Sequence, residues 1–406
     1  MNLLRDRRLA ALLGAEVVSS IGTQMTWLAL PWFVLRTTGS PQQMTWVIVA
    51  EVVPIGVLGF WGGAIAARVG TRRTMLVCDI ARAPLLAAIP VLHAAGWLPF
   101  PALLALVAAT GIFIAPYFAV QRSVVPELVG EEHGDVAYAT AFFQAANRLT
   151  IFLGPPLAGV LISVLGAAPI LYVDAATYVL SFALIAAFVH PPELPAPAES
   201  GGVFEGVRFV LHDKLLRVWT PAFTLLDVCW NLVFASLPVL VVTTYHANPR
   251  ILGLLFGALG GGALIGAFAS MRVVRTINPL TLGSVAFTFQ MVSLWSLALP
   301  APWVVPLVGM AFAGFFMSIV NAPIQALVML RIPRELRTQG IAAFGVFQCI
   351  GTPIGLVAAG YALARYDTHS VLGVVLTLQS VAIATVVTAA LVERSALRAA
   401  PVDSPA

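Results

Sequence analysis

The sequence predicts an all-α membrane protein with twelve transmembrane helices in two pseudo-symmetric bundles of six. Of its 406 residues, 60% are hydrophobic and only 10% are charged, whereas an ordinary soluble domain carries about 25% charged residues. The apolar residues gather in runs long enough to cross a bilayer, which takes about 20 residues per helix. Features of the first half also recur in the second half. These observations exclude a soluble globular enzyme and a disordered chain.

The apolar runs divide into six before and six after a polar interval in the middle of the chain. The first six are residues 9–35, 42–66, 74–97, 101–121, 136–165 and 169–189. The second six are residues 216–245, 252–271, 279–299, 302–330, 339–366 and 370–391. Three arginines precede the first run, as in a signal peptide. We nevertheless interpret this run as the first span, because it is too long for a signal peptide and contains Glu16.

The polar interval is predicted to be a linker, since it starts with PPELPAPAESGG at Pro191. We expect an N-terminal bundle over residues 1–190, a cytoplasmic linker over 191–214, and a C-terminal bundle with a short cytoplasmic tail over 215–406. Leu30-Pro31 in the first half recurs as Leu237-Pro238 in the second. Such parallel repeats are typical of transporters whose site lies between the two halves.

The basic residues predict the orientation in the membrane. All but five of the 22 Lys and Arg residues fall in the two tails or in loops on the side of the N-terminus. Of these five, Arg36, Arg250 and Arg365 lie on the opposite side, and Arg82 and Arg148 lie within spans. By the positive-inside rule, both termini are cytoplasmic. The net charge of +4 therefore reflects topology, and no clustered basic face indicates nucleic acid as a partner.

No nucleotide-dependent or metal-dependent chemistry is predicted. Lys214 is the only lysine and follows Asp213, so the chain has no GK[ST] phosphate-binding loop. The six histidines form neither HExxH nor a metal-ligand cluster. The three cysteines lack CxxC spacing and are expected to serve packing. We therefore expect no enzymatic activity, no cofactor and no metal site.

Two motifs carry a family resemblance. Residues 63–73, GAIAARVGTRR, resemble the G-x-x-x-D-R/K-x-G-x-R/K-R/K loop signature of the major facilitator superfamily, with Ala67 in place of the acid. Residues 154–159, GPPLAG, are similar to the GPxxGG core of the drug:proton antiporter signature, with Ala158 for one glycine. The antiporter-like motif comprises Gly154, Pro155 and Gly159.

Further stretches resemble the macrolide and multidrug exporter branch of that superfamily, which includes enterobactin exporters and Tap-like pumps. They are Ser20-Ile-Gly22, Asp79-Ile-Ala-Arg82-Ala83, Arg122-Ser-Val-Val-Pro126-Glu127-Leu128, Val173-Asp174-Ala175 and Glu205-Gly206-Val-Arg208-Phe209. Together they cover nearly the whole chain. The resemblance implies the major facilitator fold.

The resemblance also implies a cytoplasmic gate at the first motif, where arginines and an acid bridge helix ends. The same arginines also act simply as topology anchors. Asp79 is the nearest substitute for the missing acid, and the alternative is a pair with Arg82 at i,i+3 that only neutralises both charges. The residues assigned to the gate are Gly63, Arg68, Gly70, Arg72, Arg73, Asp79 and Arg82.

Ionisable side chains inside apolar spans are informative, because each costs about 3 kcal/mol unless it faces a cavity or a partner. Glu16, Glu51, Arg148 and Asp227 lie several residues from a span end. Polar residues recur near them at helical spacing, which indicates a wet helix face or hydrogen bonds between helices. The residues assigned to proton coupling and the substrate cavity are Glu16, Gln24, Trp27, Glu51, Gln144, Arg148, Asp227, Asn231, Asn321 and Gln325.

We expect a secondary active transporter that exports amphipathic drug-like molecules, such as macrolides or other antibiotics, in exchange for protons. Glu51 or Glu16 is expected to carry the proton, with Arg148 tuning its affinity or competing with a cationic substrate. The protein is placed as a monomer in the bacterial cytoplasmic (inner) membrane. The alternatives are an exporter of siderophores or metabolites, an importer on the same fold, and a transporter-derived sensor without flux.

Overall fold

All regular elements in the described part of the chain are helices. The computed structural model describes residues 7–121, 124, 133–189, 203–246, 248–273, 277–333 and 337–399. The helices of the N-terminal half are α1 (Arg7–Thr38), α2 (Pro41–Val69), α3 (Thr71–Ala94), α4 (Phe100–Gln121), α6 (His133–Leu165), α7 (Ala167–Phe188) and α8 (Val203–His212). Those that follow are α9 (Leu216–Thr244), α10 (Pro249–Val273), α11 (Pro279–Leu294), the 3-10 helix η2 (Trp295–Leu297), α12 (Val304–Arg331), α13 (Arg337–Leu363) and α14 (Thr368–Ala399).

The helix lengths and composition fit a multi-pass membrane protein. Among the described residues, 8 helices are long and apolar enough to cross a membrane, and shorter apolar helices cover Leu149–Leu165, Thr281–Leu297 and Ile350–Leu363. Helices dominate because lipid offers no partner for backbone N–H and C=O groups, which must pair within the segment. The predicted all-α membrane fold is confirmed, and a count of twelve spans is consistent with these helices. Within the predicted linker, α8 is an additional short helix.

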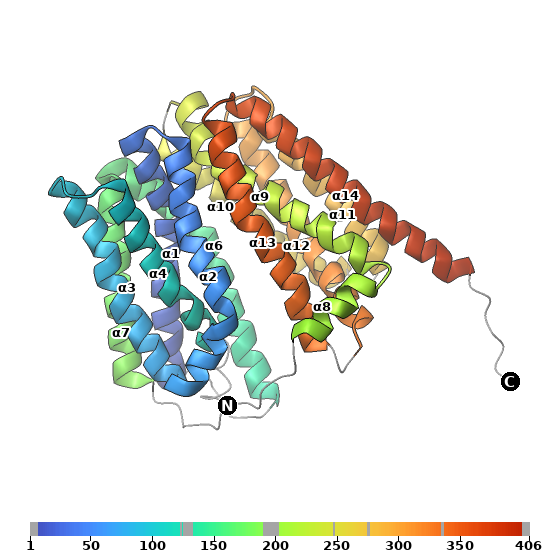
Figure 1. The fold of residues 1–406 in the computed structure, drawn as a ribbon, viewed down its shortest axis with the longest axis horizontal. Coiled ribbons are helices and arrows are strands. Elements are labelled where there is room, and N and C mark those ends of the chain that lie inside the picture. The colour runs from blue at the N-terminus through green and yellow to red at the C-terminus, as the bar shows by residue number, and fades with distance from the viewer. Residues whose placement is uncertain are drawn as a thin grey trace. The chain divides into compact units, whose positions relative to one another are not determined.

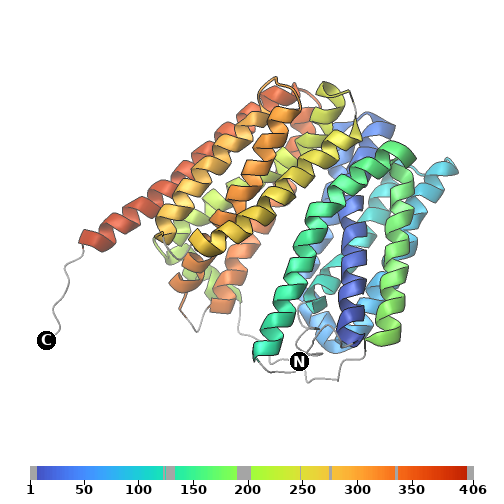
Figure 2. The same ribbon diagram turned by 180° about the vertical axis from the view of Figure 1, so that it is seen from behind.

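The chain forms two compact units, which we call the first and the second unit. The first comprises Met1–Glu199 and Leu237–Gly257, and the second comprises Ser200–Ser236 and Ala258–Ala406. In the first unit, α1 packs on α6 and α7, α2 packs on α4, and α3 packs on α4 and α7 (Figures 1 and 2). A buried cluster in this unit includes Leu12, Met75 and Ile185, which are fully buried.

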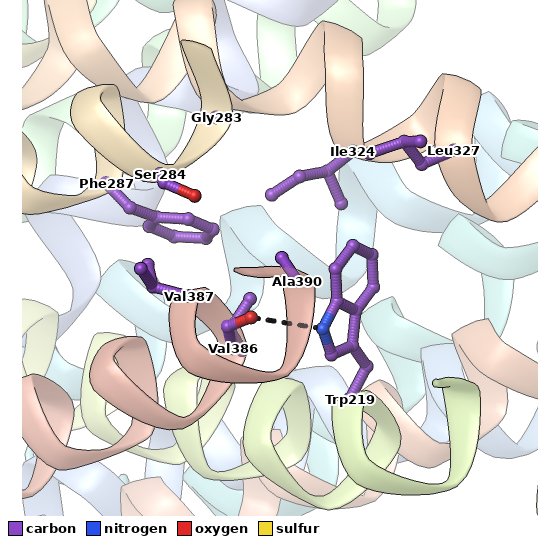
Figure 3. Close-up of a pocket in the computed structure, with 9 residues that line it drawn as sticks. All are labelled: Trp219, Gly283, Ser284, Phe287, Ile324, Leu327, Val386, Val387 and Ala390. Carbon is purple, nitrogen blue, oxygen red and sulfur yellow. Dashed lines mark hydrogen bonds between the residues drawn. The ribbon is translucent and has the colours of Figure 1, made fainter. Parts of the chain in front are cut away.

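In the second unit, α11 packs on α12, and α13 packs on α8. Its apolar core includes Trp219, Leu216 and Ile332. Figure 3 shows a small cavity of about 10 Å³ beside the Trp219 ring, whose indole Nε1 donates a hydrogen bond to the carbonyl of Val386 over 3.3 Å. A cavity of this size holds about one water molecule, so it does not serve as a substrate site.

Asp213 joins α9 and α12 in the second unit. Its Oδ1 accepts hydrogen bonds of 3.0 Å from the backbone N–H groups of Leu215 and Leu216 at the start of α9. Its Oδ2 accepts a 2.9 Å hydrogen bond from Nε of Arg331, the last residue of α12. The carboxylate therefore caps one helix and pairs with a cation at the end of another.

We expect Asp213→Ala to lower the free energy of unfolding by about 1–2 kcal/mol, since both the cap and the pair are lost. Asp213→Asn keeps an acceptor oxygen for the cap and loses only the ion pair, so a loss of about 0–1 kcal/mol is expected. Thermal unfolding of the purified protein in detergent measures both. Equal losses in the two variants would contradict the capping role.

Candidate transport site

Glu16 is buried in the first unit and surrounded by neutral donors. Its side chain on α1 is only 3% exposed. Ser20, one turn further along α1, donates a 2.9 Å hydrogen bond to Oε1. Gln121 from α4 also donates to Oε1, and the Tyr117 hydroxyl lies 3.4 Å from Oε2. The carboxylate is therefore held by groups that carry no charge.

Asp79 and Arg82 form a buried ion pair on α3. Arg82 Nη2 lies 2.5 Å from Asp79 Oδ1, and the two side chains are 3% and 0% exposed. The Ser181 hydroxyl of α7 donates a 2.7 Å hydrogen bond to the other carboxylate oxygen. The guanidinium carbon lies 4.5 Å from the ring centroid of Tyr117 and 4.2 Å from that of Tyr178. The cation is thus enclosed by its own acid and two aromatic faces.

A further buried acid, Asp174 of α7, contacts α1. It is fully buried, and it accepts hydrogen bonds from the Thr26 hydroxyl of α1 over 2.6 Å and from the Thr177 hydroxyl over 3.1 Å. One turn away, the hydroxyls of Thr23 and Tyr178 lie 3.0 Å apart. Glu16 of α1 therefore contacts α4, and Thr26 of α1 contacts α7.

Glu51 lies on α2, close enough to Asp174 of α7 for the two carboxylates to interact. Its side chain lies near that of Trp27 of α1, which is itself 47% exposed. The backbone carbonyl of Glu51 lies so close to Gly111 of α4 that a Cβ at Gly111 would collide with it. This close contact between helices fixes the depth of Glu51 relative to α4.

Asp227 is part of a polar group in the second unit. Its Oδ2 accepts hydrogen bonds from Thr352 of α13 over 2.7 Å and from Asn231 of α9 over 3.1 Å. Asp227 and Asn231, one turn apart on α9, therefore contact each other, and α13 supplies a third member that the sequence did not indicate.

The residues of the loop motif take different positions. Gly70 adopts φ 88° at the start of α3, a conformation that favours glycine. Arg72 Nη2 donates a 2.7 Å hydrogen bond to the carbonyl of Ala186 near the end of α7. Arg68 and Arg73 are exposed. Arg72 therefore binds the end of a neighbouring helix.

The antiporter-like motif lies where α6 meets α10. A Cβ added at Gly159 would lie 2.7 Å from the carbonyl oxygen of Pro249, and one added at Gly253 would lie 2.6 Å from that of Pro155. Gly154 faces α1 instead, where an added Cβ would lie 2.5 Å from Gln24 Cβ. The small residues of the motif therefore allow close approach of backbones.

We expect Gly253→Ala to lower the free energy of unfolding by about 1–3 kcal/mol, because the methyl group cannot fit without moving a helix. Gly56→Ala on α2 is the matched control, since an added Cβ there meets nothing within 4 Å. This control is expected to be neutral or slightly stabilising. Thermal unfolding in detergent compares the two, and a similar loss in both would contradict the packing argument.

The other residues of the two predicted sites divide into one exposed side chain and several that the structure does not describe. Asn321 of α12 is exposed. The side chains that lie outside the described residues are those of Gly63, Ala67, Gln144, Arg148 and Gln325.

Sequence reasoning did not select Tyr117, Gln121, Asp174, Tyr178 or Thr352 as site residues. Asp174 carried a usable signal, because it is an acid in the middle of an apolar run. The tyrosines, Gln121 and Thr352 carried none, since such residues also occur singly in membrane helices for packing or as interfacial anchors.

Apolar helices that enclose acids, an arginine and their hydrogen-bond donors define a multi-pass membrane transporter. A sequence model of the Major Facilitator Superfamily matches residues 12–356. The chain belongs to this superfamily, and it is a membrane transporter that acts on small substrates.

Its relatives include transporters of known name. The chain is 26% identical to the "Multidrug efflux pump Tap" of Mycolicibacterium fortuitum over 87% of this chain and 88% of that protein. It is 24% identical to the Tap pump of Mycobacterium tuberculosis H37Rv over 86% of this chain and 85% of that protein. The crystal structure of the nucleoside transporter NupG resembles it with a TM-score of 0.75 at 11% identity, over 96% of this chain and 99% of that chain.

Proposed function

We propose that this protein exports amphipathic drug-like molecules, with macrolides and other antibiotics among the candidates, and that protons entering the cell drive the export. It acts as a monomer in the bacterial inner membrane with both termini in the cytoplasm. The two halves of the chain provide alternating access, by which substrate and proton cross the membrane in opposite directions. The alternative substrates are siderophores or other metabolites.

Similarity to two Tap multidrug efflux pumps over most of the chain supports the export of drugs. Proton coupling rests mainly on Glu16, a carboxylate buried in the first unit among neutral donors. Such a carboxylate can take up a proton without breaking an ion pair. Asp79 differs, because its charge is already balanced by Arg82 at 2.5 Å.

The buried position also provides a reason for coupling. A charged carboxylate in an apolar bundle costs several kcal/mol without compensation, so protonation of Glu16 favours the state in which it is enclosed. Deprotonation favours a state in which water reaches it. In an exchange cycle, the protonated form changes access in one direction and the substrate-loaded, deprotonated form in the other.

The experiment is drug accumulation in an efflux-deficient bacterial host that expresses the protein, with and without a protonophore. Proton-driven export is supported if expression of the protein lowers the accumulation of a macrolide or a tetracycline and the protonophore restores that accumulation. Higher accumulation than in the empty-vector host indicates import instead. Unchanged accumulation of macrolides, tetracyclines and siderophores would refute the multidrug proposal.

A further inference from the structure

A cavity of about 800 Å³ opens at one end of the first unit. It is formed by the last residues of α1, by the junction of α6 and α7, and by the segment that joins α9 to α10. All its lining residues belong to the first unit. On the predicted topology this end faces the outside of the cell. The α1 residues that line the cavity begin at Trp32, far along the helix from Glu16. The cavity is therefore not part of the proton site.

The ionisable side chains that the structure describes in the lining of the cavity are all basic. Arg36, Arg250 and His246 line it, and its lining includes no Asp or Glu among the residues that the structure describes. The positive-inside rule disfavours arginine in outer loops, yet two of the three arginines predicted on this side lie in one cavity. Arg250 Nε donates a 2.8 Å hydrogen bond to the Ser163 hydroxyl, which holds its guanidinium beside α6.

The backbone adds to the positive electrostatic potential in the cavity. α7 begins at Ala167 after Gly166, and no side chain caps this helix start. Gly166, Ala167 and Ala168 all line the cavity. The positive end of the helix dipole therefore points to the same space as the two arginines. An anion placed here gains from all three sources of positive potential.

Part of the remaining wall is apolar, and Thr37 and Asn248 add polar groups to it. Trp32 and Phe33 of α1 and Ile162 and Leu165 of α6 line the cavity beside the cations. Its volume falls within the range of small-molecule sites. We propose that this cavity binds an amphipathic anion, with its phosphate or carboxylate at Arg36 and Arg250 and its apolar part against the aromatic wall. The anion comes from an anionic phospholipid of the outer leaflet or from a soluble amphiphile.

Two binding assays distinguish these sources. In the lipid assay, the protein is extracted from vesicles of equal phosphatidylglycerol and phosphatidylcholine, and native mass spectrometry gives the ratio of the two lipids retained. In the soluble assay, the rise in melting temperature with n-octyl phosphate is compared with that for neutral n-octyl glucoside. The test variant is Arg36→Gln/Arg250→Gln. The control variant is Arg365→Gln, which removes the third predicted outer arginine and lies in the second unit.

We expect the double variant to lose about thirtyfold in preference for the anion, since each of the two arginines near a membrane surface contributes about 1 kcal/mol to anion binding and about 1.4 kcal/mol corresponds to a factor of ten. Arg365→Gln is expected to behave like the wild type. If the double variant loses preference in the lipid assay alone, the ligand is a phospholipid. If it loses preference in the soluble assay, the ligand is a free amphiphile. The proposal is overturned if the double variant matches the wild type in both assays, or if Arg365→Gln loses as much. Arg36→Lys/Arg250→Lys, which keeps the charge, should retain most of the binding and separates a charge effect from misfolding.

Discussion

Glu16→Gln is expected to abolish transport driven by a proton gradient, down to the level of protein-free liposomes. Glutamine has nearly the shape of glutamate and keeps an oxygen that accepts from Ser20, which lies 2.9 Å from Oε1. It cannot exchange a proton. The variant should therefore fold and bind substrate while losing the coupling. Substrate-dependent proton flux in proteoliposomes, followed with a pH-sensitive dye, measures the effect.

Two matched variants make this result specific. Glu51→Gln neutralises the other carboxylate that the sequence suggested, and Asp174→Asn neutralises the buried acid on α7. Both are expected to keep proton flux if Glu16 is the carrier. Full coupling in Glu16→Gln, together with its loss in one of the other two, would move the proton site to that residue. Ser20→Ala should reduce transport only modestly, because Tyr117 and Gln121 still donate to Glu16.

Arg82→Gln is expected to lower the free energy of unfolding by about 3–5 kcal/mol, because it leaves a buried carboxylate without its cation. Asp79 is fully buried, and Ser181 is then its main remaining donor. Unfolding in mixed detergent micelles measures the loss. The variant is expected to give less folded protein as well.

The double variant Asp79→Asn/Arg82→Gln removes both charges and is expected to recover most of that stability. An unfolding free energy as low as that of Arg82→Gln would contradict the ion-pair interpretation. The same variant also tests the two roles considered for Asp79. Wild-type transport by a stable double variant indicates that the pair only neutralises charge, whereas slow transport indicates that Asp79 acts in the gate.

The positions of the helices follow closely from the sequence. The fourth predicted span, residues 101–121, corresponds to α4 at Phe100–Gln121, and the seventh, residues 216–245, to α9 at Leu216–Thr244. This agreement has a physical cause, since the bilayer sets the length of each apolar run and the backbone must pair within it. The sequence also showed that Glu16 and Asp227 lie within apolar spans.

The hydrogen-bond partners of the buried acids depended on the tertiary structure. Glu16 meets Gln121, 105 residues away, and Asp174 meets Thr26, 148 residues away. Helical periodicity groups the residues on one face of one helix, but it does not determine the rotation and depth at which two helices pack. Hydropathy thus fixed the fold class and the helices of this protein. Only the contacts of α1 with α4 and α7 decided that Glu16 and Asp174 are hydrogen-bonded by neutral groups, whereas the pair of Asp79 and Arg82 at i,i+3 could already be read from the sequence.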